Sequence, residues 1–193
     1  LGNAVHTMLH FDIVAKSVAI VGCGPIGLMG VNIAKAVGSS RIIAIEINDY
    51  RLKLAKELGA DVVINPLEED VVARVLEETN GVGVDVVCEY SGNKSAIEAA
   101  FKYVKPGGKM SMLGLVNQKI ECDLSNDVIF KGITIYGVIG RKMFETWNQV
   151  AGLLESGKLD LKRIVTHVYP LAEFEKGIDA MRSGKSGKVV LIP

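Results

Sequence analysis

Short runs of apolar, mostly β-branched residues alternate with helical segments along most of this chain, and this alternation constrains the fold more than any other feature. The pattern predicts six strands, at 17–21, 41–45, 62–64, 84–88, 109–113 and 133–137. It predicts helices at 25–37, 49–58, 67–78, 95–104 and 144–155. Strands that no polar residue interrupts are typical of a parallel sheet covered on both faces. The chain is therefore expected to adopt an α/β fold, a doubly wound six-stranded parallel sheet.

Charge and composition argue against several classes of function. Acidic and basic side chains are equal in number, 22 of each, whereas a nucleic-acid-binding protein needs a cationic face. No apolar run approaches the roughly 20 residues of a membrane span, and no signal peptide opens the chain. Cys23, Cys88 and Cys122 are far apart and form no CxxC pair, so neither a zinc site nor a disulfide framework is indicated. We expect a reduced, cytoplasmic protein without nucleic-acid or membrane partners.

A glycine-rich segment, SVAIVGCGPIGLMG at 17–30, marks the point where the first predicted strand meets the first helix. In a doubly wound sheet of the Rossmann type, such a turn holds the pyrophosphate of a dinucleotide. Gly22 would allow the tight turn, Gly24 would let the backbone approach the phosphates, and Gly27 would let the helix pack closely on the strand. The helix N-terminus presents free N–H groups to the anion, and Pro25 suits its first turn.

A carboxylate further along the chain strengthens this interpretation. Glu46 ends the second predicted strand, 19 residues after Gly27, where the dinucleotide motif places an acceptor for the adenosine ribose hydroxyls. Two alternatives remain open. Glycine-rich turns also occur for structural reasons alone. The letters VGCG also resemble the first motif of S-adenosylmethionine methyltransferases, although these usually carry glycine where this chain has Ile26.

Longer segments resemble a known family. GCGPIGLMGVNIAKAVG, LAKELGADVVINP, GVDVVCEYSG and VKPGGKMSMLGL are similar to the cofactor domain of zinc-containing medium-chain alcohol and polyol dehydrogenases. VIFKGITIYGVIGRKMFETWNQVAGLLESGKLDL and MRSGKSGKVVLIP resemble, more narrowly, the branch of that family that oxidises L-threonine. The resemblance covers essentially the whole chain. It implies an NAD-linked oxidation of a secondary alcohol, L-threonine to 2-amino-3-oxobutanoate, with a sorbitol- or butanediol-type polyol dehydrogenase as the alternative.

The resemblance implies roles for residues on the adenosine side of the cofactor. Ile26 would pack beside the pyrophosphate, Glu46 would hold the adenosine ribose, and Arg51 would lie against the adenine end. Glutamate stands at position 46 where this family more usually has aspartate, and the longer side chain would shift the ribose slightly. A carboxylate here repels the 2′-phosphate of NADP, so NAD is the expected cofactor.

The resemblance also implies contacts on the nicotinamide side. The run Leu113, Gly114 and Leu115, at the end of the fifth predicted strand, would face the nicotinamide half. Val138 and Ile139, after the sixth strand, would hold the carboxamide through backbone groups. All these positions lie at or beyond the carboxyl ends of predicted strands, where open α/β sheets bind their ligands.

The same family builds its catalytic zinc site and a separate four-cysteine zinc site in an N-terminal domain, and this chain matches neither. The three cysteines do not fit either set, and His6, His10 and His167 have no metal-binding spacing. No catalytic residue and no metal ligand is therefore expected here, and zinc is expected only in the parent protein.

The resemblance further implies how the chain is divided and assembled. Residues 1–161 are expected to form the NAD(P)-binding domain, and 162–193, a strand–helix–strand segment, to be a tail that packs on an absent catalytic domain. The start at Leu1 rather than methionine fits a piece of a longer protein. A stand-alone NAD-binding module without catalysis is the alternative. Because sixth strands pair across a two-fold axis in this family, a homodimer or homotetramer is expected.

Overall fold

The computed structural model describes residues 1–193 and contains one six-stranded parallel sheet in the order β3-β2-β1-β4-β5-β6. From β1, the chain adds β2 and β3 on one side, and it then returns to add β4, β5 and β6 on the other side of β1. The strand order therefore reverses between β1 and β4, which leaves a crevice at the carboxyl ends of these two strands. The predicted doubly wound sheet is confirmed. Its strands are β1 (Ser17–Val21), β2 (Arg41–Ile45), β3 (Val62–Ile64), β4 (Val84–Glu89), β5 (Val104–Met112) and β6 (Thr134–Gly137).

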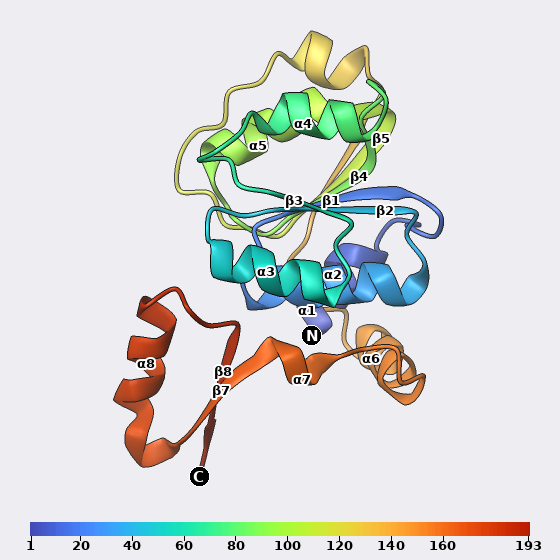
Figure 1. Cartoon of the computed structure of the whole chain (residues 1–193). Coiled ribbons are helices and arrows are strands. Elements are labelled where there is room, and N and C mark those ends of the chain that lie inside the picture. The colour runs from blue at the N-terminus through green and yellow to red at the C-terminus, as the bar shows by residue number, and fades with distance from the viewer.

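Helices cover both faces of the sheet (Figure 1). One face carries α1 (Gly2–Leu9), α2 (Pro25–Val37) and α3 (Asp49–Leu58), and the other carries α4 (Val71–Glu78) and α5 (Lys94–Tyr103). Each face has its own apolar core, and successive residues of a strand enter alternate cores. In β1, for example, Val18 and Ile20 join the first core whereas Ala19 and Val21 join the second. Burial on both faces explains why the strands carry unbroken apolar runs.

The ends of α2 and α3 follow local sequence signals. Pro25 begins α2, where the N–H that proline lacks would have no intrahelical partner. Both helices end at a left-handed glycine, Gly38 with a φ of +89° and Gly59 with a φ of +116°. Asn48 caps α3, because its side chain accepts a hydrogen bond from the N–H of Arg51 at 3.1 Å. These two helices have the predicted bounds.

The prediction for α4 is wrong at its start. A helix was expected from residue 67, but α4 begins at Val71. Asp70 is the N-cap, since its carboxylate accepts hydrogen bonds from two backbone N–H groups of the first turn. Leu67 lies in the preceding turn with 76% of its surface exposed, so its apolar character does not mark a helix face.

The predicted start of β5 is also wrong. The strand expected at 109–113 begins at Val104, so the segment Pro106-Gly107-Gly108 lies inside β5, next to an irregularity in its register with β4. The remaining predicted elements of the sheet and its helices, including α6 (Glu145–Glu155), agree with the structure to within one residue at either end.

Before the C-terminal two-stranded sheet, three elements are present that the sequence pattern did not predict. They are α1, a π-helical turn η1 (Leu124–Ile129) and the single-turn helix α7 (Leu161–Ile164). In α1, Val5 and Met8 are fully buried against α2. The spacing of these two apolar residues is typical of a helix, but a helix of this length offers too few such positions for the pattern to be strong.

The C-terminal residues form a separate two-stranded parallel sheet beside the main body (Figure 1). It consists of β7 (Val165–Pro170) and β8 (Lys188–Ile192), joined by a 3-10 turn η2 (Leu171–Glu173) and α8 (Phe174–Arg182). This strand–helix–strand order agrees with the expected one. Neither strand joins the six-stranded sheet. Separately, no helix in the structure has both the length and the apolar character needed to cross a membrane.

Candidate cofactor-binding site

The turn between β1 and α2 is tight, and two of its glycines are required by the fold. Gly22 has a φ of +88°, and a Cβ at this position would lie 2.9 Å from the backbone nitrogen of Ser91. A Cβ on Gly27 would overlap the carbonyl oxygen of Gly22. The glycine at position 27 therefore allows α2 to start directly against the end of β1.

Gly24 differs from these two because nothing in the protein requires it to be a glycine. Its φ is −60°, which any residue adopts, and a Cβ there would meet no atom within 4 Å. Gly24 is the N-cap of α2, and no side chain caps this helix. The N–H groups of the first turn thus have no side-chain acceptor, and the positive end of the helix dipole is left without a capping side chain. This arrangement is the usual form of a phosphate site.

Glu46 follows β2 and points back to the glycine turn. Its Oε2 accepts a hydrogen bond from the N–H of Cys23 at 2.8 Å. Its Oε1 accepts hydrogen bonds from the N–H groups of Ile47 at 3.0 Å and Asn48 at 3.2 Å. A carboxylate can accept about four hydrogen bonds. With three in use, Glu46 is held rigidly at the turn and keeps acceptor capacity for a ligand hydroxyl.

A cleft of about 730 Å³ opens beside Glu46 at the carboxyl ends of β1, β2 and β4. Arg51, from the first turn of α3, also lines the cleft, with its Nη1 4.0 Å from Glu46 Oε2. The Nε of Arg51 also lies 3.5 Å from the carbonyl oxygen of Ser186, which belongs to the loop before β8. Of the predicted site residues, the structure places Gly22, Glu46 and Arg51 in this cleft.

Several residues that line the cleft were not singled out from the sequence. Ser91 and Asn93 follow β4, and Tyr103 contributes the end of α5. The available signal was position: residues after β4 lie at the same edge as those after β1 and β2. The remaining unpredicted lining residues come from β1, β2 and their loops, from the β3–α4 connection, from the first turn of α4, and from α5: Val21, Ile45, Ile47, Pro66, Leu67, Glu69, Asp70, Val71, Val72, Ser95, Ala96 and Ala99.

The residues predicted for the nicotinamide side lie at the neighbouring strand ends. The N–H of Leu113 donates to the carbonyl oxygen of Glu89 at 2.9 Å, and the N–H of Val138 donates to that of Met112 at 2.8 Å. These bonds extend the ladders of β5 and β6 by one residue. Leu115 and Ile139 follow with 95% and 91% of their surfaces exposed. Two apolar side chains therefore stand uncovered at this edge of the sheet.

Two cysteines, Cys23 and Cys88, and two histidines, His6 and His167, have structural surroundings. Cys23 and Cys88 are fully buried, and burial raises the pKa of both thiols, that of Cys88 to about 12. Both therefore stay protonated. The Nδ1 of His6 donates to the carbonyl oxygen of Gly140 at 3.1 Å, and the Nδ1 of His167 lies 2.9 Å from the hydroxyl of its neighbour. No group of three or more His, Cys, Asp or Glu residues is arranged to hold a metal ion.

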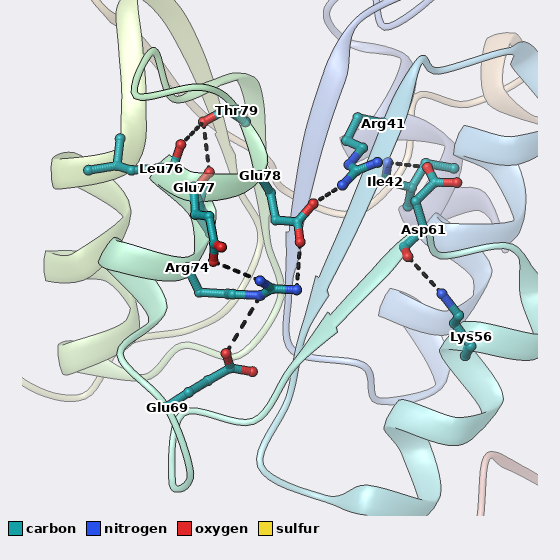
Figure 2. A network of polar contacts seen from close by, with 11 residues as sticks. Arg41, Ile42, Lys56, Asp61, Glu69, Arg74, Leu76, Glu77, Glu78 and Thr79 are labelled. Atoms are coloured by element: carbon teal, nitrogen blue, oxygen red, sulfur yellow. Dashed lines mark hydrogen bonds and ion pairs between the residues drawn. The ribbon is translucent and has the colours of Figure 1, made fainter.

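A second hollow, of about 440 Å³, lies at the opposite, amino edge of the sheet and is lined almost entirely by polar residues. A network of ion pairs adjoins it (Figure 2). Arg41 and Arg74 both pair with Glu78, Arg74 at 2.6 Å, and Arg74 also pairs with Glu77 at 2.7 Å and Glu69 at 3.7 Å. Because these charges are paired with one another and lie away from the crevice between β1 and β4, we assign them to joining α4 to β2.

The fold and the cleft together define a domain of the dinucleotide-binding type, and the sequence places it in a family. The model of the family described as zinc-binding dehydrogenase matches residues 25–156, from the start of α2 to the end of α6. This chain belongs to the zinc-binding dehydrogenase family.

Curated relatives narrow the similarity. The chain is 53% identical over 194 aligned positions to an L-threonine 3-dehydrogenase of Caldanaerobacter subterraneus subsp. tengcongensis, and 55% identical to one of Bacillus velezensis. Each alignment covers 100% of this chain and 56% of the relative, so the chain spans about half the length of the proteins it matches.

Solved structures agree on the fold. The alcohol dehydrogenase TADH from Thermus sp. ATN1 matches 99% of this chain with a TM-score of 0.91 and 33% identity, over 55% of its own length. A 2R,3R-butanediol dehydrogenase from Bacillus subtilis matches 100% of this chain with a TM-score of 0.91 and 29% identity, over 55% of its length.

Proposed function

We propose that this chain is the NAD-binding part of a zinc-dependent dehydrogenase. The observation that carries the proposal is the Glu46 carboxylate, held by the Cys23 N–H beside an uncapped helix N-terminus, in a chain that matches zinc-binding dehydrogenases. A carboxylate at the end of β2 together with a glycine turn after β1 fits a dinucleotide. Residues 1–161 form the cofactor domain in this proposal, and 162–193 form a tail.

The adenosine half of NAD is proposed to occupy the 730 Å³ cleft. Glu46 would accept hydrogen bonds from the ribose hydroxyls, and Arg51 would lie against the adenine end. The pyrophosphate would bind the N–H groups at the start of α2, with Gly24 and Pro25 beneath it and Ile26 beside it. Ile26 is 37% exposed, so its side chain is accessible there.

The nicotinamide half is proposed to lie beyond the ends of β5 and β6. Leu113, Gly114 and Leu115 would face the ring, and the backbone of Val138 and Ile139 would bind the carboxamide. The exposed apolar side chains of Leu115 and Ile139 support this placement, because uncovered apolar groups often mark a binding surface.

The parent protein is proposed to oxidise a secondary alcohol, most specifically L-threonine to 2-amino-3-oxobutanoate. NAD supplies the hydride acceptor when it is bound. The substrate assignment rests on relatives named L-threonine 3-dehydrogenase that match the full length of this chain at about half identity. The residues of this chain do not fit a zinc ion, so zinc-dependent steps would depend on other parts of the parent.

A polyol substrate is a second candidate, because the butanediol dehydrogenase structure matches the whole chain as well as TADH does. The two substrates differ chemically, since threonine carries an ammonium and a carboxylate beside its hydroxyl and butanediol carries neither. Assaying the full parent protein with NAD and each substrate decides between them. A kcat/KM for L-threonine well above that for 2,3-butanediol supports the first assignment, and the reverse supports the second.

The tail is proposed to pack on the rest of the parent protein. The small sheet and α8 leave many large apolar side chains uncovered: Val168, Leu171, Phe174, Met181, Leu191 and Ile192. Uncovered apolar groups grouped on one small unit favour an interaction surface. A hydrophobic dye should bind this chain, and Phe174→Lys with Leu191→Lys should reduce that binding. Equal dye binding by the double variant would argue against the proposal.

Titration calorimetry of this chain with NAD tests the cofactor proposal itself. One molecule of NAD per chain is expected, because the chain has one glycine turn and one carboxylate in the required positions. Absence of binding heat together with absence of any NAD-dependent rise in melting temperature would overturn it.

A further inference from the structure

A buried carboxylate at the end of β4 has no part in the site as described so far. Glu89 is the last residue of β4 and has no exposed surface. Its Oε1 accepts hydrogen bonds from the N–H of Ser91 at 2.7 Å, from the Ser91 hydroxyl, and from the N–H of Gly92 at 2.9 Å. Its Oε2 is buried without a hydrogen-bond partner. Burying a carboxylate in this way is costly unless it is bound by donors, so its place calls for a reason.

The first residue that Glu89 holds borders the glycine turn. The backbone nitrogen of Ser91 would lie 2.9 Å from a Cβ at Gly22, so the two backbones are in close contact. The Ser91 hydroxyl donates to Glu89 and also accepts a hydrogen bond from the N–H of Asn93 at 3.1 Å. This hydroxyl is therefore engaged within its own loop, and Ser91 forms a fixed wall of the turn at which the pyrophosphate is proposed to bind.

The second residue that Glu89 holds borders the nicotinamide side. A Cβ on Gly92 would overlap the carbonyl oxygen of Leu115, and a Cβ on Gly114 would overlap the backbone of Gly92. The Oε2 of Glu89 lies on this side, 2.5 Å from the position of a Cβ on Gly114. The loops after β4 and β5 are thus packed backbone to backbone, with the Glu89 carboxylate beneath them.

We propose that Glu89 is a positioning residue for the cofactor, whose carboxylate fixes the distance between the pyrophosphate turn and the Leu113–Leu115 segment. It does so by holding Ser91 against Gly22 and Gly92 against Leu115 at the same time. The inference rests on the proposed NAD binding and adds to it that the two halves of the cofactor are aligned through this one side chain.

The chemistry of the group fits this role. A carboxylate accepts hydrogen bonds and donates none, so one oxygen can gather the three donors of the loop. Glutamine in its place would put an NH₂ group either at these donors or in the buried position of Oε2 beside Gly114, where it would lack an acceptor. Burial raises the pKa of Glu89, and the hydrogen bonds from Ser91 and Gly92 oppose that rise.

The test compares two ligands on the Glu89→Gln variant by calorimetry. NAD spans both halves of the site, whereas AMP occupies only the adenosine half. The variant should bind NAD about tenfold more weakly than the wild-type chain while its affinity for AMP changes less than about twofold. Asp85→Asn is the matched control, because Asp85 is a hydrogen-bonded carboxylate at the other end of β4, outside the cleft. It should leave both affinities unchanged.

The outcomes separate this inference from the proposed function. If the wild-type chain binds NAD but Glu89→Gln binds it equally well, or loses NAD and AMP affinity in equal proportion, the positioning role is wrong. If the wild-type chain does not bind NAD, the proposed function fails and this inference fails with it. Should Glu89→Gln not fold, Glu89→Asp keeps the negative charge but draws the carboxylate back by one methylene, and it must weaken NAD binding about threefold and leave AMP binding unchanged, or the inference is overturned.

Discussion

The carboxylate of Glu46 accepts a 2.8 Å hydrogen bond from the backbone N–H of Cys23, which joins the end of β2 to the glycine turn after β1. The bond fixes the proposed ribose acceptor relative to the proposed phosphate site within the protein itself. A dinucleotide would therefore meet both groups already in place, which reduces the entropic cost of binding. Cys23 contributes only its backbone, so its buried thiol need not take part.

Cofactor choice follows from Glu46. We expect NAD to bind at least about tenfold more tightly than NADP, because a carboxylate at the ribose repels the 2′-phosphate. Arg51 could pair with that phosphate, but its guanidinium already lies 4.0 Å from Glu46. Glu46→Ala should weaken the binding of NAD and reduce the difference between the affinities for NAD and NADP. Calorimetric titrations with the two cofactors measure both effects, and NADP binding as tight as NAD binding would refute the ribose assignment.

Gly24 separates a ligand requirement from a folding requirement. Because a Cβ there meets no protein atom, Gly24→Ala should lower the free energy of unfolding by no more than about 1 kcal/mol. The same Cβ would lie where the pyrophosphate is proposed to approach, so NAD affinity should fall at least about tenfold. Denaturant unfolding and calorimetry provide the two measurements.

Gly152→Ala is the control for that variant. Gly152 lies inside α6, also with no atom within 4 Å of a Cβ, and alanine there should stabilise the helix by about 0.5–1 kcal/mol. It should leave NAD binding unchanged. Unaltered NAD affinity in Gly24→Ala would show that the phosphates do not lie at this turn.

How far the sequence predicts this molecule depends on whether a feature is local. The bounds of α2 and α3 were predictable because Pro25, Asn48, Gly38 and Gly59 act within one turn of the helix end. The length of β5 was not predictable, because the first residues of this strand become part of the sheet only through pairing with β4. Proline and two glycines within that segment point away from a strand on local grounds.

The candidate site shows the same division. Glycines and an acidic residue at fixed spacing indicate a turn and its carboxylate from one short stretch. Ser91 enters the cleft because β4 pairs with β1, which sets Glu89 opposite Val21. The contact of Arg51 with Ser186 joins residues 135 positions apart. Neither relationship has a local sequence signal, because each depends on which strands and loops become neighbours in the fold.

Acid should destabilise the chain partly through Asp85. Burial alone would raise the pKa of this carboxyl, but the hydrogen bonds from Lys105 and Ser17 outweigh burial and leave the pKa below its usual value. A lowered pKa in the folded state contributes stability above the unfolded pKa, and that stability is lost as the pH falls through the folded value. Asp85→Asn should lower the free energy of unfolding at pH 7 by about 1–3 kcal/mol.

The sign of the pH dependence provides the check on Asp85. Between pH 5 and pH 3, the wild-type chain should lose more stability than Asp85→Asn does, because only the wild type has this carboxylate to protonate. Urea unfolding followed by circular dichroism measures it. An equal loss of unfolding free energy in the wild-type chain and in Asp85→Asn would show that Asp85 is not a source of the acid sensitivity.

Assembly should proceed through β6. This edge strand pairs only with β5, and Ile135 on it is 45% exposed. An edge of this kind is a template for pairing with another chain, so we expect at least a homodimer. Ile135→Lys should shift the chain toward the monomer, because charge on an edge opposes pairing. Light scattering at micromolar concentration reports the mass, and a monomeric wild type would contradict the expectation.

Catalysis should be absent from this chain even where cofactor binding is present. No cluster of ligands here can hold zinc, which would supply the Lewis acid for deprotonating an alcohol. NADH absorbance should therefore stay at the level of a no-protein blank with L-threonine and NAD, whether zinc is added or not. Turnover well above the blank would show that the chain holds a catalytic group that the structure does not reveal.

The most direct test of the account is an NMR titration of the labelled chain with NAD, followed at the backbone amides. We predict shifts at the glycine turn, at Glu46 to Arg51 and at the loops after β4, β5 and β6. We predict none at Asn80 and Lys105, which line the hollow at the amino edge. No shifts at any concentration, or shifts centred on the amino edge, would contradict the claim that the crevice between β1 and β4 binds the cofactor.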